Sequence, residues 1–323
     1  MNELDRRRSF WVSYGMIIVV IGVVAYLLAT IERLKFAWHR REASKVFIYT
    51  SQDQVYAEPI LQEFERQTGI EVRAVYDSES VKTVGLVNRL IAEKDRPQCD
   101  LFWNNEELRT RQLAAMGVFE KWVAVGHRSR RITVNTNKVS LAAAPHSLTE
   151  LTNETWRGKV ALAYPLFGTT AAHFLALRQR WGDALWQDWC RALAANKPFL
   201  VDGNSVAAQL VARGEAWVGL TDSDDISAEQ REGAPIVPLP LTDESLLIPN
   251  TIAVVRGARH QQAAEKLYAY LQRSDVLEKL VAAHALEGVS PPNGQNATLK
   301  PNWARLLADL EAGTTELKQI FLR

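Results

Sequence analysis

The sequence lacks three features that would narrow its function quickly: cysteines in a motif, an excess of one charge, and signatures of common enzymes. Its 323 residues include only two cysteines, Cys99 and Cys190, which are far apart and fit two buried free thiols at least as well as a disulfide. The formal net charge of +1 gives no support for a nucleic-acid partner, which usually meets a basic face. We therefore expect no nucleic-acid partner.

Catalytic motifs are also missing. The sequence contains no GxxxxGK followed by Ser or Thr, no HExxH, no GxGxxG after a strand and no GxSxG. Its six histidines are scattered without metal-ligand spacing, and His173 is expected to pack rather than to bind a ligand. We predict that the protein is not an enzyme and has no cofactor. A hydrolase that uses paired carboxylates remains a minor alternative.

One long apolar run is present near the N-terminus. After Arg6, Arg7 and Arg8, residues 10–31 are mostly apolar, and these about 22 residues are long enough to span a bilayer. A cleaved signal peptide has a similar pattern, but Leu27 fits poorly at a cleavage site after Ala29. We predict a cytoplasmic tail (1–9), a transmembrane signal-anchor (10–31) and a linker (32–44). Lys and Arg on both sides leave the orientation open.

From Lys45 onward, short apolar runs alternate with helical patterns. The first predicted unit has strands at Val46–Tyr49, Ile70–Tyr76 and Asp100–Trp103, and helices at Tyr56–Gln67, Ser80–Glu93 and Glu106–Met116. The second has strands at Lys159–Ala163, Ala216–Thr221 and Ile236–Leu241, and helices at Thr169–Trp181, Leu185–Ala195 and Ser205–Arg213. Three more helices are predicted at Gln261–Leu271, Asp275–His284 and Trp303–Phe321. This alternation predicts an α/β fold with parallel sheets covered on both faces.

Two extended segments, Ile132–Asn135 and Thr251–Val255, would connect the units. We therefore predict two lobes with two hinge crossovers and a cleft between them. Lobe 1 would comprise residues 45–134 plus 252–323, and lobe 2 residues 135–251. Closure around a ligand is the expected motion of such a molecule.

Candidate ligand-binding residues follow from where parallel sheets bind ligands, outside the carboxyl ends of their strands. In lobe 1 they are Ser51, Asp53, Asp77, Glu79, Asn104 and Glu106, and in lobe 2 Asp222 and Asp224 follow a predicted strand. A solvated acidic loop remains an alternative interpretation.

Four stretches together carry a family resemblance. They are YTSQDQVYAEPILQEFERQTGIEV, QCDLFWNNEELRTRQLAAMGVFE, TWRGKVALAYP and NSVAAQLVARGEAWVGLTDSDD. In order and spacing, roughly over residues 46–290, the chain resembles the periplasmic solute-binding proteins of bacterial ABC importers, in the ferric-ion-binding branch of extracellular solute-binding protein family 1. The resemblance implies a monomer of the periplasmic-binding-protein fold that captures a ligand and delivers it to an ABC permease. It also implies an inner-membrane, single-pass protein with its lobes in the periplasm, or a cleaved protein free in the periplasm.

The resemblance adds two helix starts in lobe 2 to the candidate ligand-binding residues, at Thr169, Thr170, Asn204 and Ser205. Free N–H groups at helix starts attract anions. The same resemblance implies Asp53, Glu106 and Asp222 as the candidate metal ligands, and their carboxylates are hard oxygen donors. Ordinary N-caps remain an alternative interpretation of the helix starts.

The sequence departs from this family at the residues that hold iron. The family's tyrosine pair falls at Thr221–Ser223, where no tyrosine is present, and its histidine falls at Asp53. Its glutamate falls at Asn105 or Glu106. We therefore expect either a metal ion such as ferric iron, bound as cargo, or a small anion or zwitterion such as a phosphonate. A ligand-sensing module for a membrane signalling partner is the alternative function.

Overall fold

The computed structural model describes residues 23–24, 26–33, 45–77, 84–241, 243–290 and 298–322. The chain divides into two units, Met1–Lys45 and Val46–Arg323. In the first unit, residues 23–24 and 26–33 are helical and Lys45 begins the first strand. Most of the predicted membrane segment and linker lies outside the described residues. Within the described part of the chain, no helix combines the length and apolar character needed to span a bilayer.

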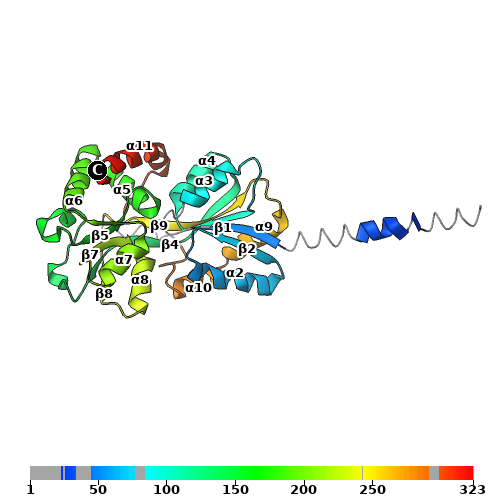
Figure 1. The fold of residues 1–323 in the computed structure, drawn as a ribbon, viewed down its shortest axis with the longest axis horizontal. Coiled ribbons are helices and arrows are strands. Elements are labelled where there is room, and N and C mark those ends of the chain that lie inside the picture. Colours follow the sequence, from blue (N-terminus) through cyan, green and yellow to red (C-terminus); the bar gives the residue numbers. More distant parts are fainter. Residues whose placement is uncertain are drawn as a thin grey trace, which may run out of the picture. The chain divides into compact units, whose positions relative to one another are not determined.

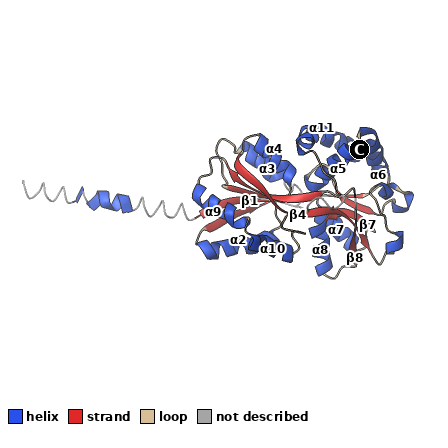
Figure 2. Cartoon of the chain, turned by 180° about the vertical axis from the view of Figure 1, so that it is seen from behind, coloured by secondary structure: helices blue, strands red, loops and turns tan. Residues whose placement is uncertain are grey.

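The second unit is built on strands that pair in the order β2-β1-β3-β9-β4-β7-β5-β6, with β8 also on β4 (Figure 1). The strands are β1 (Lys45–Thr50), β2 (Glu71–Tyr76), β3 (Leu101–Asn104), β4 (Phe119–Asn135), β5 (Val160–Ala163), β6 (Phe199–Val201), β7 (Val218–Asp222), β8 (Ile236–Leu239) and β9 (Leu247–Val255). The helices are α2 (Gln54–Thr68), α3 (Val84–Ala92), α4 (Glu107–Ala115), α5 (Gly168–Trp181), α6 (Asp183–Ala195), α7 (Asn204–Ala212), α8 (Ser223–Arg231), α9 (Gln261–Leu271), α10 (Ser274–Ala282) and α11 (Trp303–Phe321). Helices cover both faces of the strands (Figure 2), which confirms the predicted α/β architecture.

Lobe 1 is organised by the alternation of side chains along β3. Leu101 and Trp103 enter a core with α2, α9 and α10, whereas Phe102 enters a second core with α3 and α4. Successive strand residues point to opposite faces. Because both faces are covered, the first three residues of β3, Leu101 to Trp103, form a continuous apolar run.

Lobe 2 repeats this plan with β5 parallel to both β6 and β7. Its core gathers Phe174 of α5, Trp186 and Trp189 of α6, and Leu220 of β7. Cys190 lies in the same core, and both cysteines are free and buried, which is one of the two states that the sequence left open.

Two long strands connect the lobes. β4 pairs with β9 as far as Ser129–Leu247, and from Arg130–Asp222 onward it pairs with β7. The two crossovers therefore exist as predicted, but the passage into lobe 2 precedes the boundary drawn between residues 134 and 135. The part of β4 before Ile132 was not predicted as a strand, because residues 128–131 include three arginines.

The C-terminal helix differs from the prediction that it belongs to lobe 1. Leu306, Leu310, Leu317 and Phe321 of α11 are buried in the lobe 2 core with residues of α5 and α6. These positions form one apolar stripe of helical period, and a helix packs where that stripe finds an apolar partner. α11 also contacts α4, so it touches elements of both lobes.

Candidate functional site

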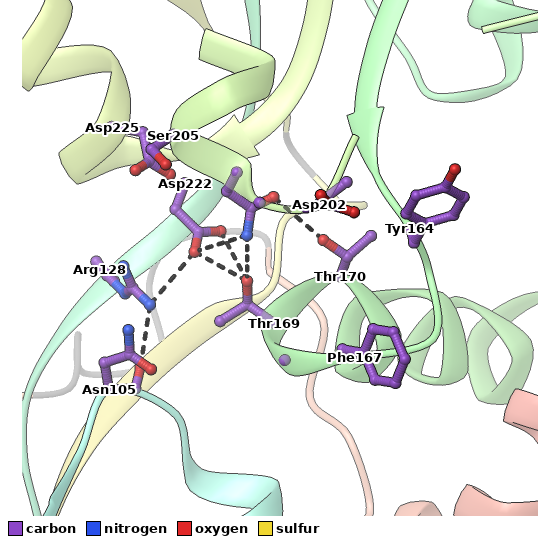
Figure 3. A pocket seen from close by; sticks show the side chains of 14 residues that line it. Asn105, Arg128, Tyr164, Phe167, Thr169, Thr170, Asp202, Ser205, Asp222 and Asp225 are labelled. Atoms are coloured by element: carbon purple, nitrogen blue, oxygen red, sulfur yellow. Dashed lines mark hydrogen bonds and ion pairs between the residues drawn. The ribbon is translucent and has the colours of Figure 1, made fainter. Parts of the chain in front are cut away.

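A small cavity of about 50 Å³ lies where the C-terminal ends of β5, β6 and β7 lead into α5, α7 and α8 (Figure 3). It is lined by Asn105, Arg128, Ala163, Tyr164, Phe167, Gly168, Thr169, Thr170, Asp202, Gly203, Asn204, Ser205, Asp222 and Asp225. Because β5, β6 and β7 are parallel, their following helices all begin at one edge of the sheet. Five of the predicted binding residues, all from lobe 2, meet here.

Two of these helices begin without side-chain caps. Phe167 and Gly203 occupy the N-cap positions of α5 and α7, and neither supplies a capping hydrogen bond within the described part of the chain. Gly168 has a φ of 53°, which favours glycine where the chain turns into α5. First-turn N–H groups have no partner inside their own helix, and the helix dipole makes this end partly positive. The cavity is therefore bordered by backbone groups suited to an anion.

Asp222 is the fully buried carboxylate at the centre of the site. It sits at the N-cap position of α8, yet its side chain accepts hydrogen bonds from Arg130 Nη1 (2.6 Å) and Thr169 Oγ1 (2.8 Å). Asn204 Nδ2 lies 3.4 Å from the same carboxylate. Burial raises the pKa of Asp222, but Arg128 and Arg130 outweigh this effect and hold the pKa below its ordinary value.

Sequence reasoning missed Arg128 and Arg130. They are two residues apart on β4, so both side chains reach the same face of the strand. Arg130 is fully buried and donates to Asn204 Oδ1 at 2.8 Å as well as to Asp222. Arg128 donates to Asp224 and, at 3.2 Å, to the carbonyl of Asn105. A sequence signal for them existed, because arginine occupies two alternating positions just before the predicted crossover Ile132–Asn135.

Three carboxylates at the start of α8 come close enough to share a metal ion. Oxygen atoms of Asp222, Asp224 and Asp225 lie within 4.8 Å of one another. Asp224 pairs with Arg128, whose pKa is lowered by burial but raised more by Asp224 and its acidic neighbours. Asp225 accepts from the Thr221 hydroxyl at 3.1 Å. The positive charges of Arg128 and Arg130 therefore neutralise part of the negative charge of these three carboxylates.

Ser51 and Asn104, predicted as binding residues, belong to an internal network. The Ser51 hydroxyl donates to Asn104 Oδ1 at 2.6 Å, and the Asn105 N–H donates to Ser51 Oγ at 2.9 Å. Asn104 Nδ2 donates to the Glu106 carbonyl at 2.6 Å. This network positions Asn105, a lobe 1 residue that lines the cavity.

The other lobe 1 candidates that the structure describes do not line the cavity. Glu106 caps α4, accepting from the Arg109 N–H at 3.0 Å, and burial raises its pKa. Asp53 occupies the N-cap position of α2, and Asp77 donates its N–H to the Thr50 carbonyl at 3.1 Å. Glu79 lies outside the described residues. Among the described residues, the carboxylate group at the start of α8 includes Asp222 but neither Glu106 nor Asp53, because Glu106 is occupied by its own helix.

Two lobes joined by paired strands, with a polar cavity at the strand ends, define an extracytoplasmic solute-binding protein. The chain belongs to the bacterial extracellular solute-binding proteins, whose family model matches residues 45–284. This assignment confirms that the protein is a binding protein and not an enzyme.

The chain is similar to bacterial proteins whose names or solved structures include iron or a sugar phosphate. It is 24% identical over 295 residues to the major ferric iron-binding protein of Neisseria gonorrhoeae, covering 83% of this chain and 86% of that protein. Iron-bound HitA from Pseudomonas aeruginosa matches in structure with a TM-score of 0.74 at 17% identity, over 85% of this chain and 99% of HitA. AfuA from Actinobacillus pleuropneumoniae, with fructose-6-phosphate bound, matches with a TM-score of 0.69 at 19% identity, over 86% and 96%. The structural matches confirm the two-lobed fold.

Proposed function

We propose that the protein is the solute-binding component of an ABC import system and captures a small solute with a phosphate- or phosphonate-type head. The observation that carries this proposal is the cavity that joins the buried Arg128 to the uncapped starts of α5 and α7. Asp202 and Asp225, on the same cavity, suit a positive group if the solute is a zwitterion.

An oxyanion in this cavity would find complementary donors. The first N–H groups of α5 and α7 border the cavity, and anions at helix N-termini typically gain about 0.3–1 kcal/mol each. Arg128 is 4% exposed, and its Nε has no hydrogen-bond partner among the described residues. A guanidinium N–H donating to an oxyanion forms a charge-assisted bond, which is about twice as strong as a neutral one.

Ferric iron is the second candidate. The carboxylates of Asp222, Asp224 and Asp225 favour it, as does the similarity to relatives named for ferric iron. Against it, Arg128 and Arg130 place two positive charges beside these carboxylates. The sequence also has no tyrosine at Thr221–Ser223, where the family's iron-binding pair falls. We therefore rank an anionic solute above iron.

Delivery and tethering complete the proposed role. The closed lobes would present the solute to an ABC permease, as expected for a member of this family. The apolar residues 10–31 would hold the protein on the outer face of the inner membrane. Their length and lack of central charge support this part of the proposal.

Thermal unfolding of the full-length protein tests the ligand class. Inorganic phosphate, methylphosphonate, 2-aminoethylphosphonate and ferric citrate are added separately. Binding at a hundredfold excess over the Kd should stabilise the protein by about 2.7 kcal/mol. Arg128→Gln should abolish the response to the anions, whereas Arg131→Gln, a neighbour paired with Glu287, should retain it. A response to ferric citrate alone would favour iron, and no response to any compound would contradict the proposal.

A further inference from the structure

A second, larger hollow adjoins the cavity. It is an open surface hollow of about 550 Å³ and shares Tyr164, Phe167 and Asp202 with the cavity. From these shared residues it extends to Arg109 of α4 and Lys318 of α11. A solute whose head lies in the cavity can therefore place the rest of its structure in this hollow, which we call the side groove.

The shared border is aromatic. Tyr164 follows β5 and Phe167 directly precedes α5, and both rings lie on the side of the cavity opposite Arg128 (Figure 3). Phe167 is 41% exposed, and Leu322, which also lines the side groove, is 46% exposed. Exposed aromatic and apolar side chains beside a polar cavity favour a flat, apolar ring, because aromatic pairs attract beyond simple burial.

Two cationic side chains and one carboxylate, Asp202, line the side groove. Arg109 and Lys318 come from different helices, and both line it. Arg109 Nη1 donates to Gln112 at 2.8 Å, which leaves other guanidinium N–H groups for a solute. Two cations that line the same groove as the two aromatic rings suit an acidic substituent on the ring.

We propose that the solute is a ring-bearing phosphate ester. Its phosphate occupies the cavity, its flat ring packs against Tyr164 and Phe167, and an acidic substituent on the ring faces Arg109 and Lys318. This inference rests on the proposed function and adds the class of organic body that the protein selects. A sugar phosphate satisfies the cavity equally well but offers the aromatic border no flat apolar face.

Calorimetry on the full-length protein distinguishes these solutes. The probes are inorganic phosphate, fructose 6-phosphate, phenyl phosphate and 4-carboxyphenyl phosphate. Phenyl phosphate should bind about tenfold more tightly than inorganic phosphate, and the carboxylated ester should bind more tightly still. Phe167→Ala should bring the ratio of the phosphate and phenyl phosphate Kd values close to one. Phe199→Ala, which removes a comparably exposed ring on β6, should leave this ratio unchanged.

The outcomes separate this inference from the proposed function. Equal affinity for inorganic phosphate and phenyl phosphate would overturn the ring assignment and leave the proposed anion site intact. Tighter binding of fructose 6-phosphate than of phenyl phosphate would also overturn it. A ring preference that survives Phe167→Ala and Tyr164→Ala together would show that the side groove is not the binding place. If none of the probes binds, the proposed function fails and the inference fails with it.

Discussion

Arg130 is a fully buried cation, and its nearest balancing charge is the carboxylate of Asp222. Removing one partner of such a pair leaves the other charge buried with less compensation, which typically costs about 3–5 kcal/mol. We expect Arg130→Met to lower the free energy of unfolding by this amount, measured by urea denaturation. Arg130→Met combined with Asp222→Asn should recover part of the loss, because neither charge then remains.

The matched control for this prediction is Arg131→Met. Arg131 is the next residue on β4, but its side chain is 31% exposed and pairs with Glu287 at 3.3 Å. A partly exposed pair contributes about 0–1 kcal/mol, so this variant should unfold almost as the native protein does. Similar losses of unfolding free energy in Arg130→Met and Arg131→Met would mean that the buried pair contributes no more to stability than the exposed one.

His173 predicts a pH dependence of stability. Burial, aided by Arg130, lowers its pKa from 6.5 to about 3, and its Nε2 donates to the Glu244 carbonyl at 2.6 Å. Between about pH 3 and 6.5 the unfolded chain therefore binds a proton that the folded protein does not. The free energy of unfolding should fall as pH falls through this window, by at most about 1.4 kcal/mol per pH unit, and should not depend on His173 above it.

Urea denaturation at pH 7, 6 and 5 measures this dependence. His173→Gln keeps an N–H donor for the Glu244 carbonyl but cannot titrate, so its stability should change less over the same range. Other groups add to the total, since burial also lowers the pKa of His127. The difference between the native and variant slopes isolates His173, and identical slopes would refute the assignment.

Among the contacts of α11 with lobe 2, the backbone at Gly313 comes especially close to α5. A Cβ atom added to Gly313 would collide with Leu175 of α5. We expect Gly313→Leu to lower the free energy of unfolding by about 1–3 kcal/mol, the usual cost of overpacking a core. Ala312→Leu adds a side chain of the same kind one position away, on an exposed face, and should have little effect. Equal effects of the two substitutions would argue against the observed packing of α11.

Helices and strands whose apolar residues recur at a regular spacing were predictable from the sequence. The predicted helices at Gln261–Leu271 and Trp303–Phe321 coincide with α9 and α11, and the strand at Val46–Tyr49 lies within β1. The helix α8 was not predicted because its residues are mostly polar. α8 begins with Ser223, Asp224 and Asp225 and contains little apolar surface, although acidic residues in a first turn are favoured by the helix dipole.

Within the candidate site, only the residues contributed by lobe 2 could be predicted from the sequence. Thr169, Asn204 and Asp222 follow neighbouring parallel strands, so their meeting follows from the sheet. The partnership of Arg130 with Asp222 does not, because it joins residues 92 positions apart through antiparallel pairing of a crossover strand. Local sequence patterns contain no information on such pairing. The sequence therefore showed the carboxylates of Asp222, Asp224 and Asp225 without the arginines that neutralise part of their charge in the folded protein.

In the molecule as a whole, a contact away from the cavity also links the lobes. Arg231 at the end of α8 donates to the Tyr56 hydroxyl of α2 at 2.7 Å and to the Ala283 carbonyl after α10 at 2.9 Å. Its guanidinium carbon also lies 5.5 Å from the centre of the Tyr56 ring. Because the first turn of α8 carries Asp224 and Asp225 and its last residue is Arg231, one helix connects the site to this contact.

Arg231→Met should therefore loosen the two lobes. Two net hydrogen bonds contribute about 1–3 kcal/mol, and each 1.4 kcal/mol changes the ratio of open to closed molecules tenfold. Small-angle X-ray scattering of the ligand-free protein should show a larger radius of gyration for this variant. Arg213→Met is the control, since Arg213 pairs at 2.8 Å with Glu215 of its own lobe. An unchanged radius for Arg231→Met would mean that β4 and β9 alone set the lobe arrangement, and hinge closure would then depend only on what the cavity binds.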